Sequence, residues 1–214
     1  MMAQTDFEKA EKLFKQENYN QAKPLFENYL KSNPNDFKTI EYLGDIAGYQ
    51  KKWDESINQY KVLKTQFPKN ANYWYKYGGA LGMKAKSVNK FKALGMIEEV
   101  RTAFLTAAKL DSKHIDTRWA LVMLYIELPA IVGGSEAKAQ KYSNELMELS
   151  KVDGFLSKGY IDEYFERYKK AEINYIKAFE IGNSKTTFQK LYNLYLNKIK
   201  DKTKANKLKQ QFEK

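Results

Sequence analysis

Residues 37–70, FKTIEYLGDIAGYQKKWDESINQYKVLKTQFPKN, are one complete copy of a unit that recurs along the chain. The unit lies between two turns of the Pro-Asn or Pro-Lys-Asn type, which begin at Pro34 and Pro68. Its small and apolar residues have the spacing of two helical faces: Ile40, Leu43, Gly44 and Ala47, then Ser56, Tyr60 and Leu63. The pattern predicts a hairpin of two helices, called the first and second helix below.

The interval between these two prolines also separates small residues elsewhere in the chain. It is the interval from Ala22 to Ser56 and again from Ala171 to Ala205. With the pattern Trp-x2-Leu-Gly-x2-Tyr, Ala-x3-Phe and Pro, this period of about 34 residues resembles the tetratricopeptide repeat. The residues that carry the resemblance are Ile40, Leu43, Gly44, Ala47, Ser56, Tyr60 and Pro68. The resemblance implies an all-α fold, a right-handed superhelical solenoid of about six helical hairpins.

We expect a single domain over residues 1–214, with repeats at about 3–36, 37–70, 71–114, 115–153, 154–185 and 186–214. In each unit a small residue, such as Gly44, Gly78 or Gly159, is expected to let the first helix lie close to the second. One hairpin cannot bury both of its faces, so stacking against neighbours should supply most of the stability.

Two repeats carry insertions between their helices. The interval from Leu81 to Val100 is ten residues longer than the equivalent interval in residues 37–70, and the extra residues fall after Gly82. One interpretation is a lengthened first helix with a longer turn, and the other is a basic, partly apolar binding loop.

The second insertion follows Pro129 and adds five residues. Pro129 should end the first helix, Gly133 and Gly134 allow a sharp reversal, and Ser135 is placed to cap the next helix. A plain turn is favoured, although a Gly-Gly-Ser entry into a helix is also compatible with an anion site at exposed backbone N–H groups.

Composition excludes several kinds of chemistry. The chain has no cysteine and one histidine, His114, which is expected to be solvent-exposed at a helix end. Adjacent carboxylates such as Glu98–Glu99 point in different directions on a helix and do not form an acid–base pair by spacing alone. No metal motif is present. We therefore predict that the protein is not an enzyme and uses no cofactor or metal.

The sequence leaves the compartment open. No apolar run approaches the roughly 20 residues that span a bilayer, so no transmembrane segment is predicted. The opening Met1-Met2-Ala3-Gln4 lacks an h-region but is compatible with the end of a signal peptide. Both a cytoplasmic location and a periplasmic or exported one, with the signal peptide absent from this chain, remain compatible with the sequence.

The resemblance implies that first helices line a concave groove. The residues expected there are Tyr42, Asp45, Tyr49, Tyr75, Lys76, Met83, Trp119, Met123, Glu127, Tyr160 and Tyr164, with Glu41 and Glu163 beside them. Tyr, Trp and Met are typical of protein-binding surfaces. The favoured function is a non-enzymatic scaffold that binds a peptide or partner protein of unknown identity. Phe7 and Glu11 occupy places where some family members hold a partner's C-terminal carboxylate, so that type of recognition is not predicted.

The net charge of +11 is concentrated in the third and last repeats. The last repeat carries Lys190, Lys198, Lys200, Lys202, Lys204, Lys207, Lys209 and Lys214. A solvated cap is the simplest interpretation. The alternative function is electrostatic binding of nucleic acid or an anionic membrane surface through these two repeats, and it is less favoured because lysine without arginine is a weak signal.

Overall fold

The computed structural model describes residues 5–213, in which all regular structure is helical. Up to Ser112 the helices are α1 (Asp6–Lys15), α2 (Tyr19–Ser32), α3 (Phe37–Tyr49), α4 (Trp53–Gln66), α5 (Ala71–Ser87) and α6 (Lys90–Leu110). From Lys113 they are α7 (Ile115–Glu127), η1 (Ala130–Val132), α8 (Glu136–Leu149), α9 (Lys151–Tyr164), α10 (Tyr168–Gly182), α11 (Lys185–Asn193), η2 (Leu194–Ile199) and α12 (Lys202–Phe212). The prediction of an all-α fold built from helical hairpins is confirmed.

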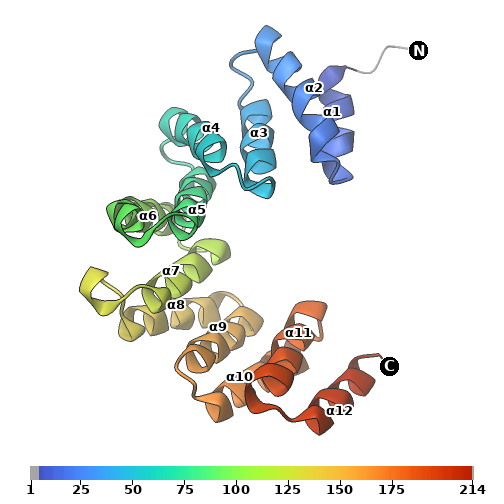
Figure 1. The fold of residues 1–214 in the computed structure, drawn as a ribbon, viewed down its shortest axis with the longest axis vertical. Coiled ribbons are helices and arrows are strands. Elements are labelled where there is room, and N and C mark those ends of the chain that lie inside the picture. Colours follow the sequence, from blue (N-terminus) through green and yellow to red (C-terminus); the bar gives the residue numbers. More distant parts are fainter. Residues whose placement is uncertain (1–4, 214) are drawn as a thin grey trace. The chain divides into compact units, whose positions relative to one another are not determined.

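The chain divides into two compact units, one up to Ser112 and one from Lys113 on. Each unit consists of three successive hairpins, and in the first unit these are α1–α2, α3–α4 and α5–α6 (Figure 1). In that unit α3 and α5, the first helices, lie on one side, and α4 and α6, the second helices, lie on the other (Figure 1). Within each unit the hairpins stack because a second helix also packs on the first helix that follows it.

Glycines permit the close approach of paired helices. A Cβ added at Gly44 would lie 2.9 Å from the ring of Tyr60, and one added at Gly159 would lie 2.4 Å from the ring of Tyr175. Both tyrosines are buried in the second helix of the same hairpin. The expectation that these glycines let the first helix approach the second is therefore confirmed, and the group that needs the space is an aromatic ring.

Three hairpins are closed by the same tight turn, which has a residue in the left-handed region. Glu17, Lys51 and Glu166 have φ values of 59°, 58° and 58°. After each of them, the next backbone N–H bonds back to a carbonyl five residues earlier, as when Lys52 N donates to Ala47 O over 2.8 Å. This is the Schellman arrangement that usually ends in glycine. None of these three positions is a glycine, so the sequence does not indicate this left-handed turn.

A glycine in this turn is expected to stabilise the protein. Lys51→Gly should raise the free energy of unfolding by about 0.5 to 1 kcal/mol, because relief of the left-handed strain exceeds the extra entropy of the unfolded chain. The matched control is Lys52→Gly, since Lys52 has a φ of −85°. Thermal denaturation should show a higher midpoint for the first variant only, and equal midpoints for the two would contradict the assignment of strain.

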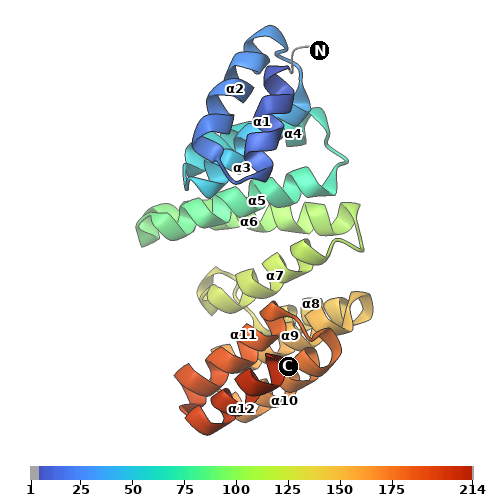
Figure 2. The same ribbon diagram turned by 90° about the vertical axis from the view of Figure 1, so that its right-hand side faces the viewer.

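The insertion after Gly82 lengthens both helices of the third hairpin. Helix α5 has 17 residues and α6 has 21, and only Val88 and Asn89 separate them. The side chain of Asn89 caps α6 by accepting a hydrogen bond of 3.0 Å from the backbone N–H of Lys92. Figure 2 shows the two long helices side by side. The lengthened first helix was correctly expected, whereas the longer turn was wrong, and the segment is helical rather than a loop.

The insertion after Pro129 is a compact turn. Helix α7 ends at Glu127, η1 follows, and Gly133 has a φ of 94°. A Cβ on Gly134 would lie 1.7 Å from the carbonyl oxygen of Leu128, so only glycine fits there. Ser135 caps α8 as predicted, by accepting a bond of 3.3 Å from the N–H of Lys138.

The backbone donors of this turn are used within the turn itself. Gly133 N donates to Ala130 O, Gly134 N donates to Pro129 O, and Ser135 N donates to Tyr125 O over 2.8 Å. Because these N–H groups already have partners, the alternative of an anion site at this helix entry is not supported.

Candidate functional site

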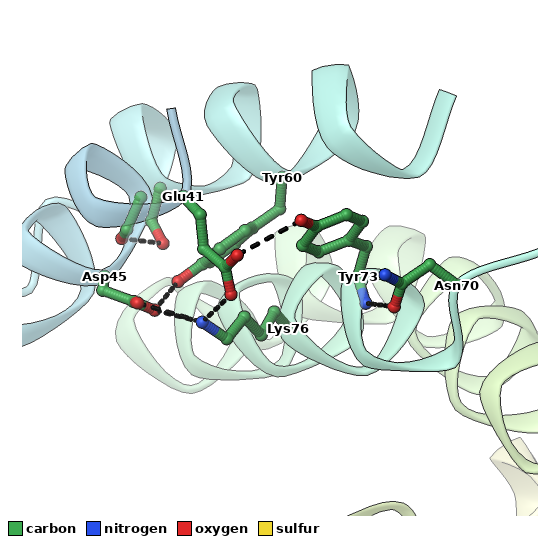
Figure 3. Close-up of polar contacts among 8 residues, drawn as sticks. Glu41, Asp45, Tyr60, Asn70, Tyr73 and Lys76 are labelled. Atoms are coloured by element: carbon green, nitrogen blue, oxygen red, sulfur yellow. Dashed lines mark hydrogen bonds and ion pairs between the residues drawn. The ribbon is translucent and has the colours of Figure 1, made fainter. Parts of the chain in front are cut away.

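Five side chains of the first unit form what we call the Lys76 cluster: Glu41, Asp45, Tyr60, Tyr73 and Lys76 (Figure 3). Lys76 Nζ donates to Glu41 Oε1 over 2.7 Å and to the two oxygens of Asp45 over 2.8 and 2.9 Å. The hydroxyl of Tyr60 donates to Asp45 over 2.5 Å, and that of Tyr73 donates to Glu41 over 3.2 Å. Helices α3, α4 and α5 all contribute, so the cluster joins two neighbouring hairpins.

Electrostatics keep the lysine of this cluster charged and its tyrosines neutral. Burial lowers the pKa of Lys76, but Asp45 and Glu41 outweigh it, and the net effect is an increase. Burial and the nearby carboxylate raise the pKa of Tyr73 to about 12, and burial and Asp45 raise that of Tyr60 further. One cation then faces two carboxylates at neutral pH, so the cluster retains a net negative charge.

A second group on the same unit surrounds Tyr42. Its ring stacks on Phe26 with centroids 4.7 Å apart and planes 13° apart. Its hydroxyl donates to Glu11 over 2.8 Å, and Lys38 Nζ donates to the same oxygen over 2.8 Å. Hydrogen bonds from Lys38, Tyr42 and Lys15 lower the pKa of Glu11 to about 2. The carboxylate of Glu11 thus joins α1 to α3.

This depressed pKa predicts a loss of stability in acid. Because the folded pKa of Glu11 is about 2 and its ordinary value is 4.5, its contribution is complete above pH 4.5 and is lost as pH falls towards 2. Partial solvent exposure screens these bonds, so the loss should be about 1 kcal/mol. Urea denaturation at several pH values should show a smaller acid loss for Glu11→Gln than for the wild type. The exposed control Glu148→Gln should follow the wild type, and identical pH profiles for the two variants would contradict the prediction.

Tyr49 is the most exposed of the aromatic residues expected in the groove. Its side chain is 61% exposed. One face of its ring stacks on Tyr19, with centroids 4.6 Å apart and planes 10° apart. Phe14 lies near both Tyr42 and Tyr49, at 4.7 and 6.2 Å between ring centroids. An exposed ring is therefore held in place beside the Tyr42 group.

The second unit has its own polar contacts between first helices. The hydroxyl of Tyr160 donates to Glu127 over 3.1 Å, and Lys190 Nζ lies 5.6 Å from the centre of the Tyr160 ring. The indole N–H of Trp119 donates to Asp153 over 2.8 Å. Of the remaining residues predicted here, Met123 and Tyr164 are exposed. Glu163 instead accepts a bond of 2.8 Å from the buried Tyr175.

Similar contacts recur about one repeat apart within each unit. Between first helices they join Tyr42 to Glu11, Tyr73 to Glu41 and Tyr160 to Glu127. Between second helices they join Lys23 to Glu55, Glu136 to Arg167 and Glu172 to Lys204, each over 2.6 Å. Many of the charged side chains therefore hold neighbouring hairpins in register.

The structure brings together some of the residues predicted for the groove and separates others. Asp45 and Lys76 are in direct contact, as are Glu127 and Tyr160. Met83 is exposed on α5. Tyr75 instead lies 6.2 Å from Phe104 of α6, between ring centroids, and so faces the second helix of its own hairpin.

Sequence reasoning missed two members of the Lys76 cluster. The spacing of Tyr60 predicts only a place in the core of its hairpin, and the repeat pattern gives Tyr73 no role. The spacing of Tyr73 and Lys76, three residues apart on one helix, places them on the same face. That spacing, together with the four-residue spacing of Glu41 and Asp45, is the feature of the sequence that indicates a polar cluster between these two helices.

His114 has a structural role at the start of α7. Its Nδ1 accepts a hydrogen bond of 3.2 Å from the backbone N–H of Thr117, and the side chain is half-buried. The predicted position at a helix end is correct, but the expected solvent exposure is not. Among residues 5–213, no group of three or more His, Asp or Glu side chains is arranged to hold a metal ion. None of the helices in that range is long and apolar enough to cross a bilayer.

No protein-family model matches the chain, and no curated protein matches it. Several solved structures, in contrast, are similar to this chain. TTC0263, a tetratricopeptide-repeat protein of Thermus thermophilus, aligns with a TM-score of 0.72 and 17% identity over 89% of this chain and 97% of that one. YrrB, a tetratricopeptide-repeat protein with an unusual peptide-binding site, aligns with a TM-score of 0.55 and 15% identity over 85% and 87%.

A human IFIT1 dimer with PPP-AAAA aligns with a TM-score of 0.74 and 19% identity over 97% of this chain and 50% of that one. At sequence identities this low, the similarity is evidence for a shared fold alone. The hairpins, the constant interval between their equivalent residues and these structural matches agree, and the chain has the tetratricopeptide-repeat fold.

Proposed function

We propose that the protein is a non-enzymatic interaction scaffold and that its first unit binds a peptide or a segment of a partner protein on the face formed by its first helices. The observation that supports this most directly is the arrangement on α3 of an exposed, stacked Tyr49 next to the carboxylates of the Lys76 cluster. A ligand would lie along α3 and α5.

The chemistry of this face favours a ligand with an apolar and a basic group. Tyr49 offers an exposed ring, and aromatic side chains often dominate protein interfaces. Glu41 and Asp45 are each about one quarter exposed, at 26% and 22%, and one lysine does not neutralise both of them. Because hydrogen bonds already hold these carboxylates, a ligand would find them pre-organised, which lowers the entropic cost of binding.

Known proteins of this fold make peptide binding a reasonable class of function. YrrB is described as having an unusual peptide-binding site. The comparison supports a peptide as the class of ligand. The predicted groove residues of the second unit, among them Met123, Tyr160 and Tyr164, belong to the same proposal as a separate surface.

The test is selection of ligands from a phage-displayed random peptide library on the wild-type protein. We expect enriched peptides that combine an apolar and a basic residue and that lose at least tenfold in affinity for Tyr49→Ala. The matched control is Val62→Ala, because Val62 is an exposed apolar residue on the second-helix side. Peptides that bind wild type, Tyr49→Ala and Val62→Ala equally would contradict the proposal.

Electrostatic binding of nucleic acid is the second candidate. The IFIT1 structure is a complex with PPP-AAAA, and the last repeat of this chain is rich in lysine. Part of that charge is neutralised locally, since Lys204 pairs with Glu172 and Lys209 pairs with Glu213. Binding of a labelled single-stranded RNA that weakens steeply between about 50 and 200 mM salt would favour this candidate. Absence of binding at the lower salt concentration would reject it.

A further inference from the structure

The lengthened ends of α5 and α6, residues 82–97, form a basic extension of the third hairpin. They contain four lysines, Lys84, Lys86, Lys90 and Lys92, and no aspartate or glutamate. The first acidic residue after them is Glu98. The extension therefore carries a concentrated positive charge.

An exposed aromatic residue lies at the turn end of this extension. Phe91, the second residue of α6, is 88% exposed and stands between Lys90 and Lys92, which are both exposed. Leu94 is one helical turn away and is 48% exposed, and a Cβ added at Gly95 would meet no atom within 4 Å. An apolar ring is thus presented to solvent and flanked by positive charge.

The charge at the turn end is not neutralised by the fold. Lys84, farther from the turn, pairs with Asp54. Neither Lys90 nor Lys92 has an ion-pair partner within residues 5–213. The exposed ring of Phe91 leaves apolar area in contact with water, which is unfavourable. Covering the ring with an apolar surface would remove this unfavourable term.

We propose that this extension docks the protein on anionic lipid bilayers. The ring of Phe91 would enter the boundary between headgroups and acyl chains, and Lys90 and Lys92 would remain among the anionic headgroups with their alkyl stems along the surface. Each lysine near such a surface increases binding about fivefold. Two lysines and one aromatic ring provide weak, reversible attachment. This inference rests on Lys90, Phe91 and Lys92, and the proposed peptide site rests on Tyr49, Glu41 and Asp45.

The shape and chemistry of the extension favour a membrane over other anionic partners. The ring stands alone near the end of a hairpin, where the sequence provides no second aromatic residue within residues 82–97 for a series of stacked bases. The cations are lysines, which act as point charges and lack the planar fork of arginine used in nucleic-acid recognition. A bilayer needs no complementary pocket, so a single exposed ring with flanking charges is sufficient for it.

Vesicle co-sedimentation tests the proposal on the full chain. We expect at least tenfold stronger binding to phosphatidylcholine vesicles that contain about a third phosphatidylserine than to phosphatidylcholine alone, because the attraction is electrostatic. The double variant Lys90→Glu/Lys92→Glu should lose at least tenfold, and Phe91→Ala about fivefold. The matched controls are Lys61→Glu/Lys69→Glu for charge, two exposed lysines outside the two basic repeats, and Ile131→Ala for an exposed apolar side chain elsewhere.

A label at the proposed contact distinguishes insertion from general attraction. The chain has no cysteine, so Phe91→Cys can carry a single environment-sensitive fluorophore. Its emission should shift to shorter wavelength on anionic vesicles, and the emission of the same label on Ile131→Cys should not. Thermal melts equal to that of the wild type would show that the charge-reversal and Phe91 variants remain folded.

Several outcomes would overturn the lipid proposal. Equal binding to neutral and anionic vesicles, or full binding by Lys90→Glu/Lys92→Glu, would remove its basis. Binding of single-stranded RNA that needs Lys90 and Lys92, without vesicle binding, would replace it with nucleic acid as the ligand. Loss of peptide binding by Tyr49→Ala with unchanged vesicle binding would leave it intact, so the two proposals can fail separately.

Discussion

Replacing Gly154 with alanine is expected to lower the free energy of unfolding by about 3 kcal/mol. Gly154 lies in the first turn of α9, and only Ser150 separates that helix from α8. A Cβ at this position would lie 2.4 Å from the Cα and 2.7 Å from the Cβ of Met147 in α8. Because a backbone atom cannot rotate away, the two helices would have to separate.

Urea denaturation followed by circular dichroism would measure the loss. The matched control is Gly79→Ala, since Gly79 lies within α5 and a Cβ there would meet no atom within 4 Å. That control should gain up to about 1 kcal/mol from the higher helix propensity of alanine. A loss of similar size in both variants would show that helix-to-helix distance is not the cause.

Removing the cation of the Lys76 cluster is expected to lower the free energy of unfolding by about 2 kcal/mol. The loss is smaller than that for breaking a fully buried ion pair, because these side chains are about one quarter exposed. Lys76→Met keeps most of the alkyl stem and leaves the carboxylates of Glu41 and Asp45 close together without a counter-ion. The exposed control Lys61→Met should change stability by less than about 0.5 kcal/mol.

A second substitution tests the cause of this loss. Adding Asp45→Asn to Lys76→Met should recover part of the stability, because it removes one of the two like charges. A double-mutant cycle on chemical denaturation gives the coupling between the two positions directly. Strictly additive losses would contradict the assignment of an ion-pair network.

The Lys76 cluster also bears on how the protein recognises a ligand. Lys76 is held by two carboxylates, so it is not free to receive an anionic group from a partner. The charge left over is negative, which is why the proposed ligand carries a basic group. Tyr49 and the carboxylates, rather than Lys76, are the residues whose substitution should change ligand choice.

Much of the local structure follows from short patterns in the sequence. The constant interval between equivalent small residues predicts the hairpins, and Ser135 was correctly expected to cap α8. Asn183 ends α10 in the left-handed region, a position that asparagine tolerates better than most residues. These features depend on backbone preferences and hydrogen bonds within a few residues, so sequence reasoning can reach them.

The third hairpin shows where such reasoning failed. Residues 82–97 were expected to include a longer turn, but they are rich in helix-forming Lys, Ala, Leu and Met, and only Val88 and Asn89 interrupt the helices. The regular turns at Glu17, Lys51 and Glu166 were also not anticipated in their left-handed form. Hydrogen bonds to the preceding helix hold this conformation without glycine.

The hairpin, its period and the small residues at which helices meet can be predicted from the sequence, because each depends on spacing along one or two helices. Which side chains of different hairpins face one another is known only from the three-dimensional structure. Tyr75 and Lys76 are adjacent in sequence, yet Tyr75 faces Phe104 and Lys76 faces Asp45, since successive helical residues point about 100° apart. The pairing of residues some 31 positions apart depends on how one hairpin is rotated against the next, which is set by packing over the whole interface.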